Sequence, residues 1–150
     1  MRKLLRQKWI AFNKSKLKNI ENVPGVYVLG YTARKSFTGT LIKMEDIFYV
    51  GMSATSLRLR LNQFLDGIED GGHHSGAKRF FWKWAAGRPF SKLKTDNKFY
   101  VATLPLECNP KKGLRSSGDL EQLGIVASLE YFVLARIKKE LDLEPPINKK

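Results

Sequence analysis

The sequence predicts an α+β domain with a small, three-stranded, mainly antiparallel β-sheet flanked by helices. Alternating apolar residues mark short strands, and apolar residues three or four apart mark helices. These strands and helices do not follow the regular βαβ order of a parallel sheet. The length of 150 residues fits one domain, which we place at residues 23–150, preceded by a basic helical extension over residues 1–22.

The elements are expected in the following order along the chain. Residues 2–18 have a basic side and an apolar side, which predicts an amphipathic helix packed on the domain or laid along DNA. The apolar side consists of Leu4, Leu5, Trp9 and Phe12. After Pro24 and Gly25, period-2 alternation over residues 26–31 predicts a strand. A polar stretch follows, with a possible short strand at residues 40–44, and residues 47–50 form the next strand, which ends at Gly51.

The second half is expected to be mainly helical. Ser53 or Ser56 can cap a helix that runs to about Leu65, and a glycine-rich loop over residues 66–76 follows. A second helix is predicted over residues 78–86 and a third strand over residues 99–104. An exposed connection over residues 105–119 leads to a long helix over residues 124–141, which ends before two prolines.

The charge of the chain indicates a polyanionic partner. The formal net charge is +13, and residues 1–20 contain seven Lys or Arg and no acidic residue. A second basic stretch, residues 78–98, interleaves aromatic residues with cations. Nucleic acid is the preferred partner because clustered cations neutralise phosphates; the alternatives are a solvated basic surface or an acidic membrane face. Lys78, Arg79 and Lys83 are candidates for contact with the nucleic-acid backbone.

Several classes of protein are disfavoured by composition. No apolar run reaches the ~18 residues of a membrane span, and no secretion signal begins the chain. The single cysteine, Cys108, excludes an internal disulfide and a multi-cysteine zinc site. A cytoplasmic location is therefore expected, without a membrane partner.

Glu130 interrupts an otherwise apolar helix face. Val126, Val133 and Ile137 share that face by their spacing. A carboxylate there costs several kcal/mol unless it is paired or binds a metal. Glu130 therefore needs a partner, either a lysine or tyrosine at the rim of the core or a metal ion.

Five elements of the chain resemble the GIY-YIG nuclease family. Gly25-Val26-Tyr27 lies on the first predicted strand and Tyr49-Val50-Gly51 on the second. The family pattern continues with an arginine on the next helix, a glutamate on a later helix and an asparagine after a proline. The matching positions are Arg60, Glu130 and Asn148, so the resemblance extends from about residue 23 to 148.

The resemblance implies a metal-dependent DNA endonuclease that hydrolyses phosphodiester bonds with a water nucleophile. Glu130 is expected to hold one Mg²⁺ or Mn²⁺ ion, which suits a single carboxylate and several waters. Tyr27 is expected to position the water and to accept or relay its proton, provided that a cation lowers its pKa. Tyr49 is expected to bond the phosphate or the water, and Arg60 to clamp the phosphate. Gly25 and Gly51 are expected beside the site.

Two features depart from the family pattern. The spacing after Tyr49 leaves Arg58 as a rival to Arg60, and Phe64 stands where many members have a histidine or tyrosine. The tandem His73 and His74 can face DNA, assist proton transfer or have no role. Of the two, His74 is the catalytic candidate and His73 a nucleic-acid contact. Asn148 is expected to tie the C-terminal turn to the domain.

Other readings remain open from sequence alone. A compact restriction-type enzyme that dimerises to cut both strands and a structure-dependent nuclease both fit. A non-catalytic nucleic-acid-binding module, or a small RNA-binding protein, that keeps the fold is the alternative from a different class.

Overall fold

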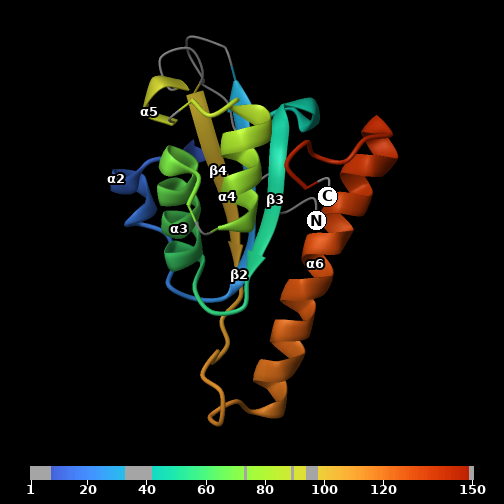
Figure 1. Ribbon diagram of the computed structural model, residues 1–150. Coiled ribbons are helices and arrows are strands. Elements are labelled where there is room, and N and C mark those ends of the chain that lie inside the picture. The colour runs from blue at the N-terminus through green and yellow to red at the C-terminus, as the bar shows by residue number, and fades with distance from the viewer. Residues whose placement is uncertain (1–7, 33–41, 73, 89, 94–97, 149–150) are drawn as a thin grey trace.

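A four-stranded antiparallel sheet forms the centre of the protein (Figure 1). The computed structural model describes residues 8–32, 42–72, 74–88, 90–93 and 98–148. Within them the strand order is β1-β4-β2-β3, and every neighbouring pair is antiparallel. The strands are β1 (Ile10–Ala11), β2 (Gly25–Thr32), β3 (Ile47–Ser53) and β4 (Lys98–Pro105). The α+β class with an antiparallel sheet is confirmed.

The prediction of three strands was wrong, because the N-terminal segment adds β1. Ile10 pairs with Val101 of β4, and the only helix in the described part of this segment is the short α2 (Lys14–Leu17). Trp9 packs into one hydrophobic core and Phe12 into the other. An extended chain crossing the sheet edge allows this, whereas one helix face would point both side chains the same way. Leu4 and Leu5 lie outside the described residues.

One face of the sheet is covered by short helices and the longer α3 (Leu57–Asp70) (Figure 1). The others are α4 (Ser75–Arg79), the π-helix η2 (Phe80–Trp84) and α5 (Phe90–Leu93). Their buried side chains join those of the sheet in a core rich in aromatic rings. We call it the aromatic core; its ring-bearing members are Phe12, Tyr27, Phe48, Tyr49, Phe64, Phe80, Phe90 and Phe99.

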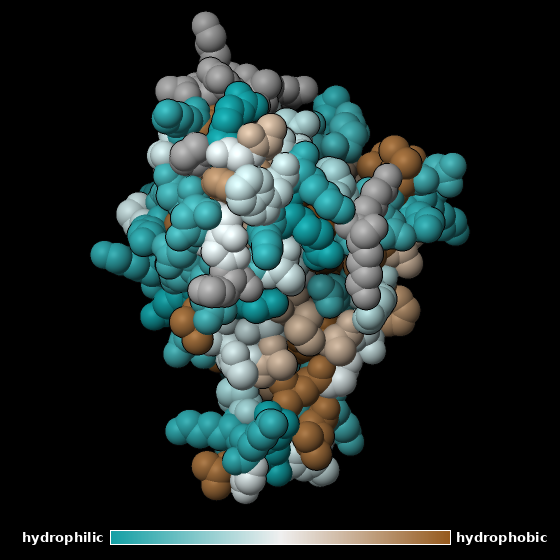
Figure 2. Space-filling view, viewed as in Figure 1, coloured by the Kyte–Doolittle hydropathy of each residue, from teal (hydrophilic) through white to brown (hydrophobic). Residues whose placement is uncertain are grey.

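The other face packs against α6 (Ser117–Leu141), which runs beside the edge strand β3 (Figure 1). This second core contains mostly branched aliphatic side chains, and we call it the aliphatic core. Its buried members are Trp9, Val26, Val28, Ile42, Ile47, Val50, Ala102, Val126, Val133 and Ile137. α6 also exposes large apolar side chains, including Leu120, and Figure 2 shows apolar residues gathered toward the end of the molecule where α6 begins.

Three helix boundaries differ from the expected ones because of local capping. α3 starts after the N-cap Ser56, one of the two predicted caps, but continues past Leu65 to Asp70 and ends at Gly71, whose φ is 78°. Gly67 allows this extension, since a Cβ there would lie 2.8 Å from the Cβ of Ala77. α4 begins at Ser75, inside the loop expected over residues 66–76.

α6 begins at Ser117 rather than Gly124. A capping box joins Ser116 and Asp119, which satisfies backbone groups of the first turn and stabilises the early start. The short strand expected at residues 40–44 lies partly outside the described residues, and Met44–Asp46 forms a 3₁₀ turn.

The turn over residues 145–148 lies against the outer edge of β3. The Ile147 backbone N–H donates to the Phe48 carbonyl at 3.1 Å. The Asn148 side chain accepts from the Val50 N–H and donates to the Val50 carbonyl, both at 2.8 Å. Asn148 thus ties this turn to the strand that carries Tyr49. Within the described residues, no helix has the length and apolar character needed to span a bilayer.

Candidate active site

Two tyrosines from neighbouring strands lie side by side on the aromatic face. Tyr27 of β2 pairs with Gly51 of β3, and Leu29 pairs with Tyr49, so the two tyrosines are diagonal neighbours on one face. Their ring centroids are 6.0 Å apart. A Cβ at Gly51 would lie 2.6 Å from the Tyr27 hydroxyl and 2.8 Å from the Tyr49 ring. Gly51 therefore makes room for both rings.

Two more glycines allow close contacts, one between β2 and β4 and the other between α4 and Tyr49. A Cβ at Gly25 would collide with the carbonyl oxygen of Leu104 in β4. A Cβ at Gly76 in α4 would lie 2.7 Å from Cζ of Tyr49 and 2.8 Å from its hydroxyl. Gly76 was not predicted from the sequence, since it belongs to no periodic pattern and only its position after the two histidines sets it apart.

The two candidate arginines on α3 point to different places. Arg58 donates its Nε–H to the carbonyl of Ile20 at 2.7 Å, away from the tyrosines. The Arg60 charge acts on Tyr27, Tyr49 and Glu130, where it opposes the rise in pKa that burial causes. The structure therefore brings Arg60, and not Arg58, to the tyrosine pair.

Glu130 of α6 lies near Tyr49 and Arg60. We call Tyr27, Tyr49, Arg60 and Glu130 together the cluster. Val126, Val133 and Ile137 on its helix face are fully buried, whereas Glu130 is half-buried. Among the described residues, none forms an ion pair or hydrogen bond with its side chain. Burial raises the pKa of Glu130, and the Arg60 charge opposes this. The lysine or tyrosine partner weighed from the sequence is thus not found in the described part of the chain.

Both phenols are held in their protonated form at neutral pH. Tyr27 is fully buried, and its hydroxyl lies close to Tyr49 and Arg60. Burial, followed by the neighbouring Tyr49, raises the pKa of Tyr27 well above its usual value near 10. Burial, followed by the Glu130 carboxylate, also raises the pKa of Tyr49. Arg60 alone does not lower these values, so a proton-accepting Tyr27 needs a further cation.

His74 is buried behind Tyr49. Its ring centroid lies 4.9 Å from that of Phe64 and 6.5 Å from that of Tyr49. Burial, followed by the Arg60 charge, lowers the pKa of His74 from 6.5 to about 4. Phe64 of α3 therefore packs against the His74 ring and offers no group that can transfer a proton. His73 lies outside the described residues.

The remaining cations lie on α4 and η2. Arg79 is half-buried, and its charge opposes the rise in the pKa of Tyr49 that burial causes and adds to the lowering of the pKa of His74 by burial. Lys78 and Lys83 are exposed on the same segment. Of the three residues that were expected to contact the nucleic-acid backbone, Arg79 is the one that the structure brings to the cluster.

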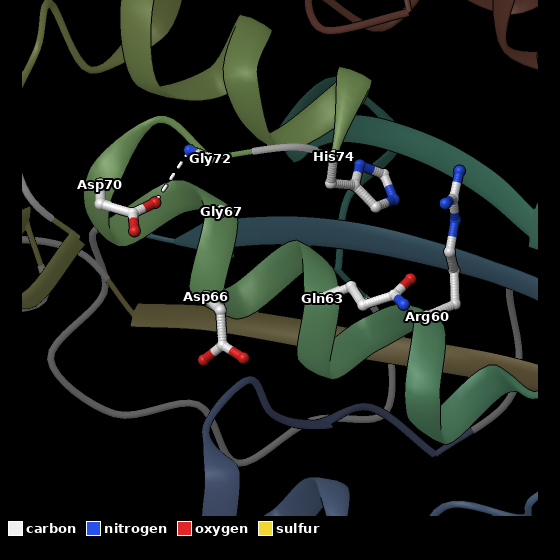
Figure 3. Close-up of a pocket in the computed structure, with 7 residues that line it drawn as sticks. All are labelled: Arg60, Gln63, Asp66, Gly67, Asp70, Gly72 and His74. Carbon is white, nitrogen blue, oxygen red and sulfur yellow. Dashed lines mark hydrogen bonds between the residues drawn. The ribbon is translucent and has the colours of Figure 1, made fainter.

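A pocket of about 410 Å³ opens beside the cluster (Figure 3). It runs along α3 toward the loop before α4. Its lining residues are Arg60, Gln63, Asp66, Gly67, Asp70, Gly72 and His74. In Figure 3 the side chains of Arg60 and His74 share one end of the pocket, and Asp66 and Asp70 lie toward the other.

The donor set near the tyrosines fits only one kind of metal site. Within the described residues, no group of three or more His, Cys, Asp and Glu side chains could hold an ion. A single half-buried carboxylate that forms no ion pair with a described residue suits a hydrated oxygen-seeking ion such as Mg²⁺, which keeps several waters. It does not suit zinc, which takes three or four protein ligands.

Comparison with protein-family models, curated proteins and solved structures finds no match.

Proposed function

We propose that this protein is a divalent-metal-dependent endonuclease that hydrolyses DNA phosphodiester bonds in the manner of the GIY-YIG family. One observation carries the proposal. Tyr27, Tyr49, Arg60 and Glu130 come from β2, β3, α3 and α6, yet their electrostatic effects on one another place them in one cluster. Each of the four also occupies its position in the sequence pattern of that family.

Each residue type suits a step of phosphodiester hydrolysis. The planar guanidinium of Arg60 binds two phosphate oxygens and offsets their negative charge. Tyr49 donates its hydroxyl hydrogen to the scissile phosphate, since its raised pKa keeps it protonated. Glu130 would hold Mg²⁺ or Mn²⁺, and such an ion supplies Lewis-acid stabilisation of the developing charge.

Tyr27 positions the attacking water. Its hydroxyl hydrogen is present at neutral pH, so in the protein alone Tyr27 orients the water and does not deprotonate it. The water oxygen forms a new bond to phosphorus as the bond to the leaving ester oxygen breaks. The attacking water releases one proton to solvent and the leaving oxygen takes one up from solvent, so the products are a phosphate monoester and a free hydroxyl. No covalent enzyme intermediate is needed.

Duplex DNA is the proposed substrate because of the charge of the protein. The net charge of +13 favours a polyanion, and Arg79 with the exposed Lys78 and Lys83 extends the cationic surface beside Arg60. Cutting both strands would suit a homodimer, which stays a prediction.

The alternative is a nucleic-acid-binding module without catalysis, on DNA or on structured RNA. The complete burial of Tyr27 favours it, since a water must reach the Tyr27 hydroxyl for hydrolysis. Such a module binds nucleic acid without a metal, loses affinity steeply with salt and is indifferent to Glu130→Ala.

Supercoiled plasmid distinguishes the two. The unaltered protein is expected to nick it in Mg²⁺ and not in EDTA, while Glu130→Gln and Tyr27→Phe lose the activity by at least about a hundredfold. Glu121→Gln removes an exposed carboxylate from the same helix and is the matched control, with nicking unchanged. Binding without nicking in every sample would reject the nuclease and support the module.

A further inference from the structure

The hydrogen bonds of His74 define which nitrogen carries its proton. His74 Nδ1 accepts hydrogen bonds from the backbone N–H groups of Gly76 at 3.1 Å and Ala77 at 3.3 Å. An imidazole nitrogen that accepts has a free lone pair and no hydrogen. The neutral ring therefore carries its hydrogen on Nε2.

That hydrogen has no acceptor within the described residues. Nε2 is buried and without a hydrogen-bond partner, and the side chain as a whole is 6% exposed. Buried donors without a partner are rare, and each one indicates that an acceptor is missing. Since Nδ1 is occupied by α4, Nε2 is the atom that remains for a ligand.

The surroundings of Nε2 indicate an anionic ligand. Figure 3 shows the His74 ring and the Arg60 guanidinium at the same end of the pocket. The charged and titratable groups around the ring are Arg60 and the more distant Asp66 and Asp70 on α3, Arg79 on α4 and Tyr49 on β3. The rise of a helix puts Asp66 about 9 Å and Asp70 about 15 Å from Arg60 along α3. The carboxylate of Glu130 on α6 lies near Arg60 but outside the pocket lining. Within the pocket, the Arg60 end is therefore the positive one.

We propose that His74, in its neutral form, donates Nε2–H to a phosphate oxygen that Arg60 binds at the same end of the pocket. His74 is then a phosphate-binding residue and transfers no proton. This deepens the proposed nuclease function, since the phosphate would be one of the nucleic-acid substrate. The anion site itself depends only on the geometry of His74 and Arg60.

A neutral donor suits this position better than a cation. Arg60 supplies the positive charge, and a second positive charge beside it would be repelled. Arg60 and burial also lower the pKa of His74 to about 4, so the ring stays neutral over the physiological range. Proton transfer through Nδ1 would require breaking both bonds to α4.

Nitrogen-15 NMR of the full chain tests the tautomer directly. The sequence contains two histidines, so a His73→Asn variant leaves His74 as the single imidazole. We expect the Nε2–H tautomer from pH 5 to 8, and a shift of the Nε2 resonance when inorganic phosphate or a short DNA duplex is added in EDTA. An Nδ1–H tautomer, a midpoint near 6.5, or no response to either probe would overturn the proposal.

Two substitutions separate binding from the structural role of His74. In His74→Asn the shorter side chain can still accept from α4 but has no group at the Nε2 position, and we expect about tenfold weaker duplex binding in EDTA. In His74→Gln the amide N–H reaches that position, and binding is expected to stay within about threefold of the unaltered protein. Equal binding by all three proteins would overturn the proposal, whatever the folding of each variant.

Failure of this site and failure of the nuclease are distinguishable. If phosphate shifts Nε2 but plasmid is never nicked, the anion site holds and the nuclease proposal falls. If plasmid is nicked but phosphate leaves Nε2 unchanged, the nuclease holds and the role of His74 is rejected.

Discussion

The two faces of the sheet are packed by different kinds of side chain. The aromatic core under α3 contains many rings in contact, including Phe48, Phe80 and Phe99. The aliphatic core under α6 contains mainly valine and isoleucine. The difference matters because a tyrosine ring can pack as a core residue while its hydroxyl stays polar, whereas valine and isoleucine bring no polar atom.

The aromatic face therefore supplies most of the candidate site. Tyr27, Tyr49 and His74 are at once core residues and polar groups. The aliphatic face contributes one site residue, Glu130, at the margin where α6 passes the edge strand β3. Substitutions in the aromatic core should perturb the site directly, whereas substitutions in the aliphatic core should change mainly the stability of the protein.

The largest expected effect is the loss of a central ring. Phe80 lies 4.8 Å from Trp84 and 5.3 Å from Phe48 between ring centroids, and is fully buried. Phe80→Ala should lower the free energy of unfolding by about 3–5 kcal/mol, measured by denaturant titration. Phe132→Ala is the control, since Phe132 is 62% exposed and its loss should change stability by less than about 0.5 kcal/mol. Similar losses for both would show that the aromatic core is not the main source of stability.

Next comes overpacking between the tyrosines. In Gly51→Ala the added methyl group would meet the Tyr27 hydroxyl at 2.6 Å, which should cost about 1–3 kcal/mol and disturb the site. Gly124→Ala is the matched change, since nothing lies within 4 Å of its Cβ position in α6. It should stabilise the protein by about 0.5–1 kcal/mol through helix propensity and leave plasmid nicking unchanged. Loss of nicking in both variants would contradict the expectation that changes on the aromatic face of the sheet affect the site more than changes on the aliphatic face.

A smaller effect concerns acid stability. The unfolded His74 titrates near 6.5 and the folded one at about 4, so between these values the unfolded chain binds more protons. The free energy of unfolding should therefore rise with pH through this window and fall as the pH drops from 6.5 to 4. The contribution is about 1–2 kcal/mol, since solvent in the pocket screens part of the charge. Subtracting the unfolding curve of His74→Asn from that of the unaltered protein should reveal this slope, and a flat difference would contradict it.

The smallest expected effect lies in the aliphatic core. Ile137→Val removes one methylene from a fully buried side chain and should cost about 0.5–1.5 kcal/mol. Plasmid nicking should persist below the unfolding temperature, because Ile137 belongs to the aliphatic core and not to the aromatic core. A loss of nicking equal to that of Gly51→Ala would mean that the two cores act as one.

Local patterns predicted the elements that have a clear period. The alternation around Tyr27 and the apolar face around Val133 placed β2 and α6, because each repeats over several residues. The N-terminal strand was missed, since two residues that join a sheet edge show no period of their own. Its formation depends on β4, almost ninety residues away in sequence.

The candidate site was predicted in part for a similar reason. Tyr27, Tyr49, Arg60 and Glu130 came from an ordered sequence pattern, and the structure brings them together. The choice against Arg58 needed its hydrogen bond to Ile20, a contact between distant segments. The tautomer of His74 depends on backbone N–H groups that exist only once α4 has formed.

The turn at residues 145–148 has a consequence for how copies of the protein meet. β3 is one of the two edge strands of the described sheet, and an open strand edge allows another chain to pair with it. Ile147 and Asn148 occupy hydrogen-bonding groups of Phe48 and Val50 that would otherwise face outward. The same contact that ties this turn to the sheet therefore covers the Phe48–Val50 part of the β3 edge, and another chain could pair with that part only by displacing the turn.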